Sequence, residues 1–317
     1  MTKYITKKVV YGFITVLVII TVVFLLMRLL PTDYFFTEEQ LMKLTPDQKQ
    51  AALETAGMTD PVLVQLGNYF ANLFTGDMGI SRKIEVGVPV ARLIGSRIGV
   101  SLQLGIVAMV ISLVLGLLLG MFQTLHKNKA GDHIGTGFTI FANAVPSLVA
   151  FSLIMVIGTR CFGLPTLYSS RSYPGISAIL PVICLSLTSI AGYAIWSRRY
   201  MVDELNKDYI KLAKMKGLTD KEIMKRHVFR NAFVPLVQYL PASFLLTIGG
   251  SLLVERFFSV PGMGPLLTDA IQRYDLNVVQ GLVVIYAVMG IGGVILGDIL
   301  MAVVDPRIKL AGKGGTR

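Results

Sequence analysis

Six long apolar runs constrain the fold of this chain more than any other feature of its sequence. A transmembrane helix needs about 20 mostly apolar residues, because each residue advances the helix by about 1.5 Å and the hydrocarbon core is about 30 Å thick. Every run is long enough to cross that core. The sequence therefore predicts an all-α integral membrane protein with six transmembrane helices, at residues 9–30, 98–122, 134–158, 176–196, 233–254 and 281–304.

The composition supports a membrane protein and excludes other classes. Only 15% of the 317 residues are charged and 53% are hydrophobic, whereas soluble domains average about 25% charged residues. This balance excludes an ordinary soluble domain, and the massed apolar residues exclude a disordered chain. The two cysteines are too few for a disulfide framework.

Basic residues are concentrated on one side of the predicted membrane topology. Six crossings place both termini on the same side, which carries 19 basic and seven acidic residues, while the opposite side carries 11 of each. Because loops rich in lysine and arginine face the cytoplasm, we expect both termini to be cytoplasmic. The net charge of +11 is explained by the basic residues in these cytoplasmic loops. No nucleic-acid partner is therefore expected.

The predicted topology divides the chain into four segments. The N-terminal lysines resemble the start of a signal peptide, but Leu29–Leu30–Pro31 offers no small-residue cleavage site, so we expect the first run to remain as an uncleaved span. The segments are a cytoplasmic N-terminus with the first transmembrane helix (1–30), an external helical segment (31–97), a core of five transmembrane helices with a cytoplasmic loop at 197–232 (98–304), and a cytoplasmic tail (305–317).

The external segment contains two helix signals. Thr45, Pro46 and Gln48 form an N-cap, a proline at the first helical position and a reciprocal capping residue, and that helix is expected to end at Gly57. A second amphipathic helix is expected after Pro61. We expect these helices to pack on the outer membrane surface or on the core, or to dock an external partner.

The cytoplasmic loop 197–232 is long and basic, yet strongly patterned. Residues 199–216 have high helix propensity, with acidic residues early and lysines late, as the helix dipole favours. Gly217 stands where a left-handed residue ends a helix, and Leu218 can make the hydrophobic contact that accompanies this ending. The pattern predicts a helix that stops sharply at the glycine.

A capping box follows that glycine. Thr219 and Glu222 have the spacing in which each side chain accepts a hydrogen bond from the other residue's backbone N–H, which predicts a second helix. The product is a rigid helix–turn–helix elbow around residues 211–222, able to fit a cleft in another protein. The alternative interpretation is a solvated loop between two spans.

Several kinds of chemistry are missing from the sequence. The chain has no GxxxxGK[ST] motif, so it has no nucleotide-binding P-loop of its own. His126 and His133 lack the further ligands that a metal site needs. Ser251 is a possible nucleophile of an intramembrane hydrolase, but no span contains a histidine or lysine to activate it. Asp298 is the clearest charged residue within a span, and such residues can couple ion movement to transport. Because no other charged residue accompanies it as a relay, a self-contained secondary transporter or channel is kept only as the alternative function.

The spans also carry signs of close packing and irregularity. The pairs Gly116/Gly120 and Gly293/Gly297 have GxxxG spacing, which permits helices to approach closely. Prolines such as Pro146 lie within or near span interiors, where neighbouring helices must satisfy the freed carbonyls. The segment 255–264 suggests a structured turn or re-entrant element just outside a span.

With these motifs the whole chain resembles the inner-membrane permease subunit of dipeptide/oligopeptide ABC importers, which has a type I ABC importer fold. The segment 209–218 is similar to the cytoplasmic EAA coupling loop of that family, with Lys211 at the position of the usual glutamate and Leu212 and Ala213 after it. The remaining similar segments are Gly76–Asp77–Met78–Gly79–Ile80–Ser81 with Pro89–Val90, Arg226–His227, Arg230–Asn231 with Pro235, Val254–Glu255–Arg256–Phe257 with Pro261–Gly262–Met263–Gly264, and Val304–Asp305–Pro306–Arg307.

The resemblance implies a transporter subunit that is not itself an enzyme. It implies a second permease subunit, two cytoplasmic ATPase subunits that hold ATP and Mg, an external substrate-binding protein, and a bacterial or archaeal inner membrane. The cargo would be di- or oligopeptides, with nickel or other metal chelates and glutathione as alternatives; the pathway residues stay unassigned. The residues expected to couple to the ATPases are Tyr209, Lys211, Leu212, Ala213, Lys214, Gly217, Leu218, Glu222 and His227.

Overall fold

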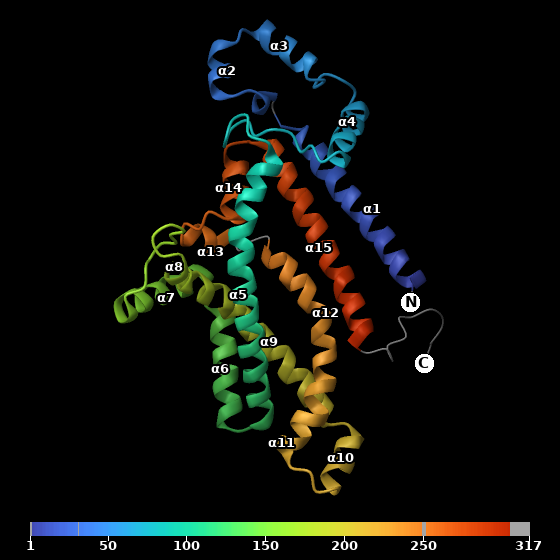
Figure 1. The fold of residues 1–317 in the computed structure, drawn as a ribbon, viewed down its shortest axis with the longest axis vertical. Coiled ribbons are helices and arrows are strands. Elements are labelled where there is room, and N and C mark those ends of the chain that lie inside the picture. Colours follow the sequence, from blue (N-terminus) through green and yellow to red (C-terminus); the bar gives the residue numbers. More distant parts are fainter. Residues whose placement is uncertain (1, 31, 249–251, 305–317) are drawn as a thin grey trace.

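Most of the long helices run roughly along the long axis of the protein, whereas α7 lies across it (Figure 1). The computed structural model describes residues 2–30, 32–248 and 252–304, and the regular elements in those ranges are helices. The long helices are α1 (Thr2–Met27), α5 (Val90–Leu125), α6 (Ala130–Ala144), α7 (Ser147–Phe162), α9 (Ile179–Leu205), α12 (Phe229–Ile248) and α15 (Leu276–Val304).

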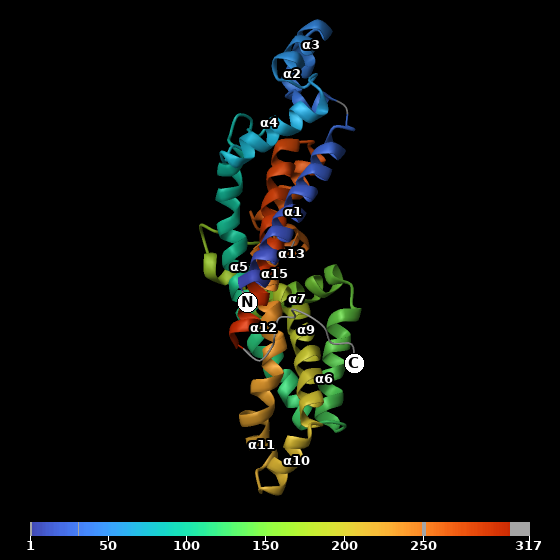
Figure 2. The same cartoon turned by 90° about the vertical axis from the view of Figure 1, so that its right-hand side faces the viewer.

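Short helices form the two ends of the molecule and some of its connections. The helices α2 to α4 lie at one end, and α10 and α11 project at the other (Figures 1 and 2). The short helices are α2 (Glu38–Lys43), α3 (Pro46–Thr55), α4 (Val62–Phe74), α8 (Pro174–Ser177), α10 (Asp208–Met215), α11 (Asp220–Ile223), α13 (Leu252–Phe257) and α14 (Met263–Gln272).

The most extensive helix–helix contact in the core joins α5 to α9. A side chain at Gly116 would place its Cβ 2.5 Å from the Cβ of Tyr193 and 2.9 Å from the backbone oxygen of Ile190. A Cβ at Gly120 would overlap the hydroxyl of Ser197. The predicted close contact through Gly116 and Gly120 is therefore confirmed, because only hydrogen at these positions allows the backbones to approach so closely.

The second packing layer joins α15 to α12 on one side and to α1 on the other. Gly297 lies against the backbone carbonyl of Gln238, with no room for a side chain between them. On α1, a Cβ at Gly12 would lie 2.8 Å from Cγ2 of Ile291. Gly297 thus has the packing role that its GxxxG spacing predicts.

The third predicted span differs from the structure. Residues 134–158 do not form one helix: α6 and α7 meet at a break and are bent by 112°. Val145 has an extended backbone, with φ −74° and ψ 129°. Pro146 causes this, because a proline lacks the N–H that would continue the helix and excludes the helical conformation from the residue before it.

The predicted number of six spans is not confirmed. Within the described ranges four helices are long and apolar enough to cross a membrane, or five if the bent pair α6–α7 counts as one span. The predicted span 233–254 coincides largely with α12, which contains Pro235 and Pro241, and residues 249–251 lie outside the described ranges.

The helical segment between α1 and α5 follows the predicted pattern. Thr45 and Gln48 form the capping box of α3, with Pro46 at its start, and Gly57 has a left-handed φ of +68° just beyond its end. Helix α4 begins after Pro61, as expected.

Candidate functional site

The elbow, residues 206–228, lies between α9 and α12 at the end of the molecule opposite α2–α4 (Figure 1). Most of the predicted loop 197–232 is helical, because α9 continues to Leu205 and α12 begins at Phe229. The helix predicted over 199–216 is interrupted at Asn206 and Lys207, so α10 is a separate helix from α9. The elbow itself consists of α10, a glycine turn, α11 and a π-helical turn at Met224–Val228.

Gly217 ends α10 as predicted, with a φ of +81°. Its N–H donates to the carbonyl of Lys214 at 2.9 Å, and the N–H of Leu218 donates to the carbonyl of Ala213 at 3.3 Å. These two bonds are the Schellman pattern, which satisfies carbonyls that a helix end leaves free. A Cβ at Gly217 would find no atom within 4 Å in the described chain, so a side chain there would project away from the protein.

The capping box at the start of α11 is also confirmed. The N–H of Thr219 donates to Oε2 of Glu222 at 2.9 Å, and the N–H of Glu222 donates to Oγ1 of Thr219 at 3.3 Å. The hydrogen bonds from the Thr219 backbone and hydroxyl hold the pKa of the Glu222 carboxyl below its ordinary value. The turn is therefore fixed on both sides of Gly217 by local hydrogen bonds.

A small apolar cluster anchors the elbow to its two stems. Ile210 and Ala213 on α10 pack with Ile223 on α11 against Met201 of α9 and Ala232 of α12, and all five are buried. Leu218 packs against the same cluster, which confirms its predicted hydrophobic contact. Ala213 therefore stabilises the shape of the elbow from inside and presents little surface to a partner, while Leu218 is only partly buried.

Three polar side chains brace the elbow from outside. The hydroxyl of Tyr209 donates to Oε1 of Glu204, and Nδ2 of Asn231 donates to Glu204 at 3.1 Å and to the Tyr209 oxygen at 3.0 Å. Burial and the hydrogen bond to Glu204 raise the pKa of Tyr209 to about 12. His227 packs its ring edge-on against Tyr209, with 6.3 Å between ring centroids.

The outward face of α10 is apolar at its centre and basic around it. Leu212 is 50% exposed and Met215 is 77% exposed. Lys211 pairs with Asp208 at 2.8 Å, and Lys214 pairs with Asp220 across the turn at 3.2 Å. Exposed apolar side chains on a rigid helix are typical of a protein-docking surface. Sequence reasoning missed Met215, although it lies one helical turn after Leu212.

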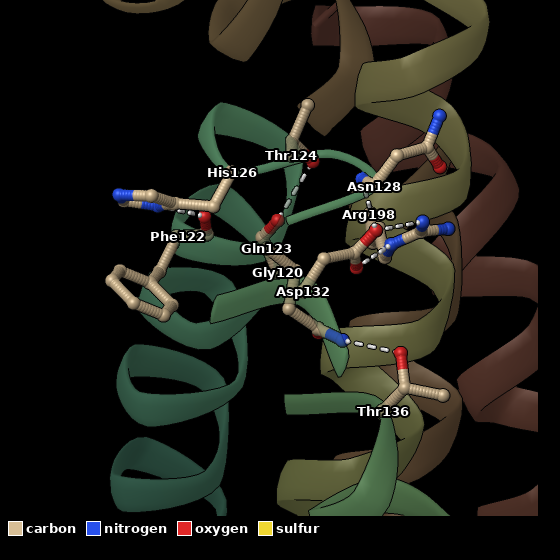
Figure 3. A network of polar contacts seen from close by, with 9 residues as sticks. All are labelled: Gly120, Phe122, Gln123, Thr124, His126, Asn128, Asp132, Thr136 and Arg198. Carbon is tan, nitrogen blue, oxygen red and sulfur yellow. Dashed lines mark hydrogen bonds and ion pairs between the residues drawn. The ribbon is translucent and has the colours of Figure 1, made fainter. Parts of the chain in front are cut away.

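A polar network fixes the stem of the elbow near the C-terminal end of α9 (Figure 3). Asp132 in the first turn of α6 is buried and accepts hydrogen bonds from Nε and Nη2 of Arg198, at 2.7 Å and 2.6 Å. The N–H of Asn128 donates to the same carboxylate at 3.0 Å. Nearby, Gln123 donates to the hydroxyl of Thr136 at 3.3 Å. Bidentate pairing orients Arg198 rigidly, so α9 is held to α6 beside the elbow, and the Gln123 bond joins α6 to α5.

The other residues singled out in the sequence fall into three groups. Within the described ranges no three His, Cys, Asp or Glu side chains gather as metal ligands. The His126 ring packs at a tilt against Phe122, with 4.4 Å between ring centroids. In segment 255–264 the predicted structured turn is present, since Glu255 is buried and accepts a hydrogen bond from the N–H of Gly264 at 2.9 Å. Ser251 and the motif residues 305–307 lie outside the described ranges.

Asp298 has two partners on other helices. Its carboxylate forms an ion pair with Lys8 of α1 and accepts a hydrogen bond from Nε2 of Gln238 on α12 at 2.9 Å. The residue therefore joins three helices of the core.

This chain belongs to the family of binding-protein-dependent transport system inner membrane components. The family model matches residues 112–310, and the model of the family's N-terminal part matches residues 1–88. The protein is therefore a multi-pass membrane permease subunit of an ABC importer, a class that works with ATPase subunits, a substrate-binding protein and a second permease.

Named relatives cover the full chain. The chain is 34% identical to the dipeptide transport system permease protein DppB of Lactococcus lactis subsp. cremoris, over 98% of this chain and 100% of that protein. It is 32% identical to the oligopeptide transport system permease protein OppB of Haemophilus influenzae, over 98% of this chain and 100% of that protein.

Solved structures share the fold at low sequence identity. An inward-facing structure of the MetNI methionine ABC transporter matches with a TM-score of 0.56 and 13% identity, over 67% of this chain and 96% of that chain. A crystal structure of an amino acid ABC transporter with histidines matches with a TM-score of 0.50 and 17% identity, over 68% of this chain and 94% of that chain.

Proposed function

We propose that this subunit forms half of a pathway that imports di- or oligopeptides delivered by an external binding protein. A second, different permease subunit would form the other half. The names of the relatives, which are dipeptide and oligopeptide systems, support peptides over metal chelates or glutathione as cargo. The excess of basic residues on the side of the elbow supports cytoplasmic termini and an external α2–α4 segment.

The elbow is the part of the chain that we assign to coupling with the two ATPase subunits. One face of α10 is anchored through Ile210 and Ala213, and the opposite face exposes Leu212 and Met215. This arrangement carries the proposal, because a docking helix transmits force only when its base is rigid and its contact surface is free. Lys211 and Lys214 would border the contact and Tyr209 and His227 would support it, while ATP and Mg would be held by the ATPases.

Gly217 offers a direct test, because a side chain there meets nothing within its own chain. Aspartate tolerates the left-handed conformation better than most residues, so Gly217→Asp changes chiefly the surface that a partner meets. We expect this variant to insert into the membrane and assemble, but to lose most peptide uptake per ATP hydrolysed in reconstituted vesicles.

Gly163→Asp is the matched control. Gly163 also has a left-handed φ, of +66°, and has open space around its Cβ, but it ends α7 away from the elbow. Normal uptake by Gly217→Asp, or an equal loss in Gly163→Asp, would contradict the proposed role of the elbow. Failure of the wild-type complex to take up peptides while transporting another solute would contradict the proposed cargo.

A further inference from the structure

A basic pocket lies at the end of the molecule opposite the elbow. Its volume is about 490 Å³, and three separate segments line it: the start of α2, the loop between α4 and α5, and the corner between α14 and α15. Its lining residues are Thr37, Glu39, Arg82, Lys83, Val86 and Arg273. None of them belongs to the elbow or its stem.

A buried carboxylate holds two walls of this basic pocket together. Asp275 is only 1% exposed, and its Oδ2 accepts hydrogen bonds from the N–H groups of Arg82 at 3.1 Å, Lys83 at 2.9 Å and Ile84 at 3.1 Å. The hydroxyl of Ser81 adds a fourth bond at 2.6 Å. Arg273 precedes Asp275 by two positions, so the backbones that carry the three basic side chains are fixed relative to one another.

The Arg82 side chain is positioned by the third wall. Its Nη1 donates to the backbone oxygen of Phe35 at 2.9 Å, and its guanidinium lies over the Phe35 ring at 3.9 Å from the centroid. Such stacking and hydrogen bonding hold a guanidinium without neutralising its charge. Arg82 therefore contributes a fixed positive charge to the basic pocket.

Basic side chains outnumber acidic ones at the basic pocket. Glu39 is its one acidic lining residue, and Glu39 forms an ion pair with Lys43 on the next turn of α2. Among the described residues, neither Lys83 nor Arg273 has an ion-pair partner. Asp275 adds a second carboxylate and interacts electrostatically with Arg82, but three basic side chains still face two acidic ones, of which Glu39 is already paired. A rigid cavity with excess positive charge attracts carboxylates from solution.

We propose that the basic pocket receives acidic side chains of the external substrate-binding protein when that protein docks. This inference rests on the proposed function, which places this end of the molecule outside the cell. Charged contacts at the border of an interface accelerate association and bind reversibly, as a partner that must dock, deliver its cargo and leave requires. The three walls also belong to both the α2–α4 segment and the core, so one docking contact would touch both.

The test uses the assembled importer in lipid nanodiscs and its purified binding protein. We expect the double variant Lys83→Glu/Arg273→Glu to slow association by at least about 10-fold at low salt, the lower end of the range for electrostatic steering. The salt dependence of association should flatten in the same variant. Lys49→Glu on α3, at the same end of the molecule, is the control and should associate like the wild type.

A second measurement covers the case in which the double variant does not assemble. Amidating the carboxylates of the binding protein should slow its association with the wild-type importer to a similar extent. The inference is overturned if the variant and wild type associate at the same rate with the same salt dependence, or if Lys49→Glu is slowed equally. It is also overturned if the variant instead loses binding of free peptide or of anionic lipid vesicles while its association with the binding protein is unchanged. A wild-type importer that binds no such protein would overturn the proposed function itself.

Discussion

Nδ2 of Asn231, at the start of α12, donates a hydrogen bond to the hydroxyl oxygen of Tyr209 on α10, 3.0 Å away. Tyr209 in turn donates to Glu204 near the end of α9. The brace therefore connects the moving element of the proposed coupling to both helices that enter the core. Any push on α10 would be carried into α9 and α12 through these contacts together with the buried cluster beneath them.

Removing this brace should loosen α10 without unfolding the protein. A hydrogen bond contributes about 0.5–1.5 kcal/mol net, so we expect Asn231→Ala to speed amide exchange in α10 by roughly 2- to 10-fold. Uptake per ATP hydrolysed should fall in parallel. The measurement is hydrogen–deuterium exchange on the purified complex. Asn206→Ala is the control, because that exposed side chain makes no hydrogen bond within the described part of the chain; equal exchange in both variants would contradict the brace.

The elbow should also loosen in acid, through Glu222. The pKa of this carboxyl is below its ordinary value of 4.5, because the Thr219 N–H and hydroxyl donate to its charged form. A group with a lowered pKa in the folded state stabilises that state above its ordinary pKa, and the stabilisation is lost as the pH falls through the lowered value. Protection of the α11 amides from exchange should therefore decrease below about pH 4.5.

The chain supplies an internal control for this acid effect. The capping boxes of α2 and α3 are closed by Gln40 and Gln48, which do not titrate. Their amides should keep their protection over the same pH range, after correction for intrinsic exchange rates. Glu222→Gln should retain both bonds of the capping box and abolish the pH dependence, whereas Glu222→Ala should lose the bond from the Thr219 N–H at every pH. If the pH response persisted in Glu222→Gln, a group other than Glu222 would be its cause.

The ion pair of Lys8 and Asp298 should matter asymmetrically. The Asp298 side chain is 8% exposed and the Lys8 side chain 37% exposed. Removing Lys8 leaves a buried carboxylate with Gln238 as its neutral donor, whereas removing Asp298 leaves an ammonium whose long stem can extend to polar surroundings. Lys8→Met should therefore lower the thermal midpoint of the purified complex more than Asp298→Asn does.

The partial exposure of Lys8 limits the stability that the ion pair contributes. Removing one partner of a fully buried ion pair costs about 3–5 kcal/mol. The pair of Lys8 and Asp298 is only partly buried, so we expect Lys8→Met to cost less than that range. The double variant Lys8→Met/Asp298→Asn should be more stable than Lys8→Met alone. Lys7→Met removes a neighbouring lysine that lies over Tyr11 and should have little effect. If Lys7→Met and Lys8→Met lowered the thermal midpoint equally, the ion pair would not be the cause of the loss.

Local signals in the sequence were sufficient to predict the turn of the elbow. The left-handed Gly217 and the capping box of Thr219 and Glu222 depend on residues within a few positions of one another, so their spacing alone specifies them. The breaks at Asn206–Lys207 and Val145–Pro146 were harder. Hydropathy reports the length of an apolar run but not its direction, so the sequence indicates an irregularity at Pro146 but not the 112° bend between α6 and α7.

Contacts between distant residues could not be predicted from a single sequence. Tyr209 and Asn231 are 22 positions apart, and the carboxylate of Asp275 meets the N–H of Lys83 across 192 positions. Nothing in the residues around either partner indicates the other, because tertiary packing alone brings them together. For the same reason the basic pocket, whose walls come from three segments, has no signature in the sequence.

Because α5 packs closely on α9 at Gly116 but has open space at Gly99, the same substitution should have different effects at these two glycines of α5. At Gly116 a methyl group would lie 2.5 Å from Tyr193 Cβ, whereas at Gly99 it would have nothing within 4 Å. Overpacking costs about 1–3 kcal/mol, while replacing a mid-helix glycine by alanine in open space gains about 0.5–1 kcal/mol. We therefore expect Gly116→Ala to lower the thermal midpoint of the complex and Gly99→Ala to leave it unchanged or raise it. If both variants shifted the midpoint in the same direction by the same amount, the packing of Gly116 against Tyr193 would not limit the approach of the two helices.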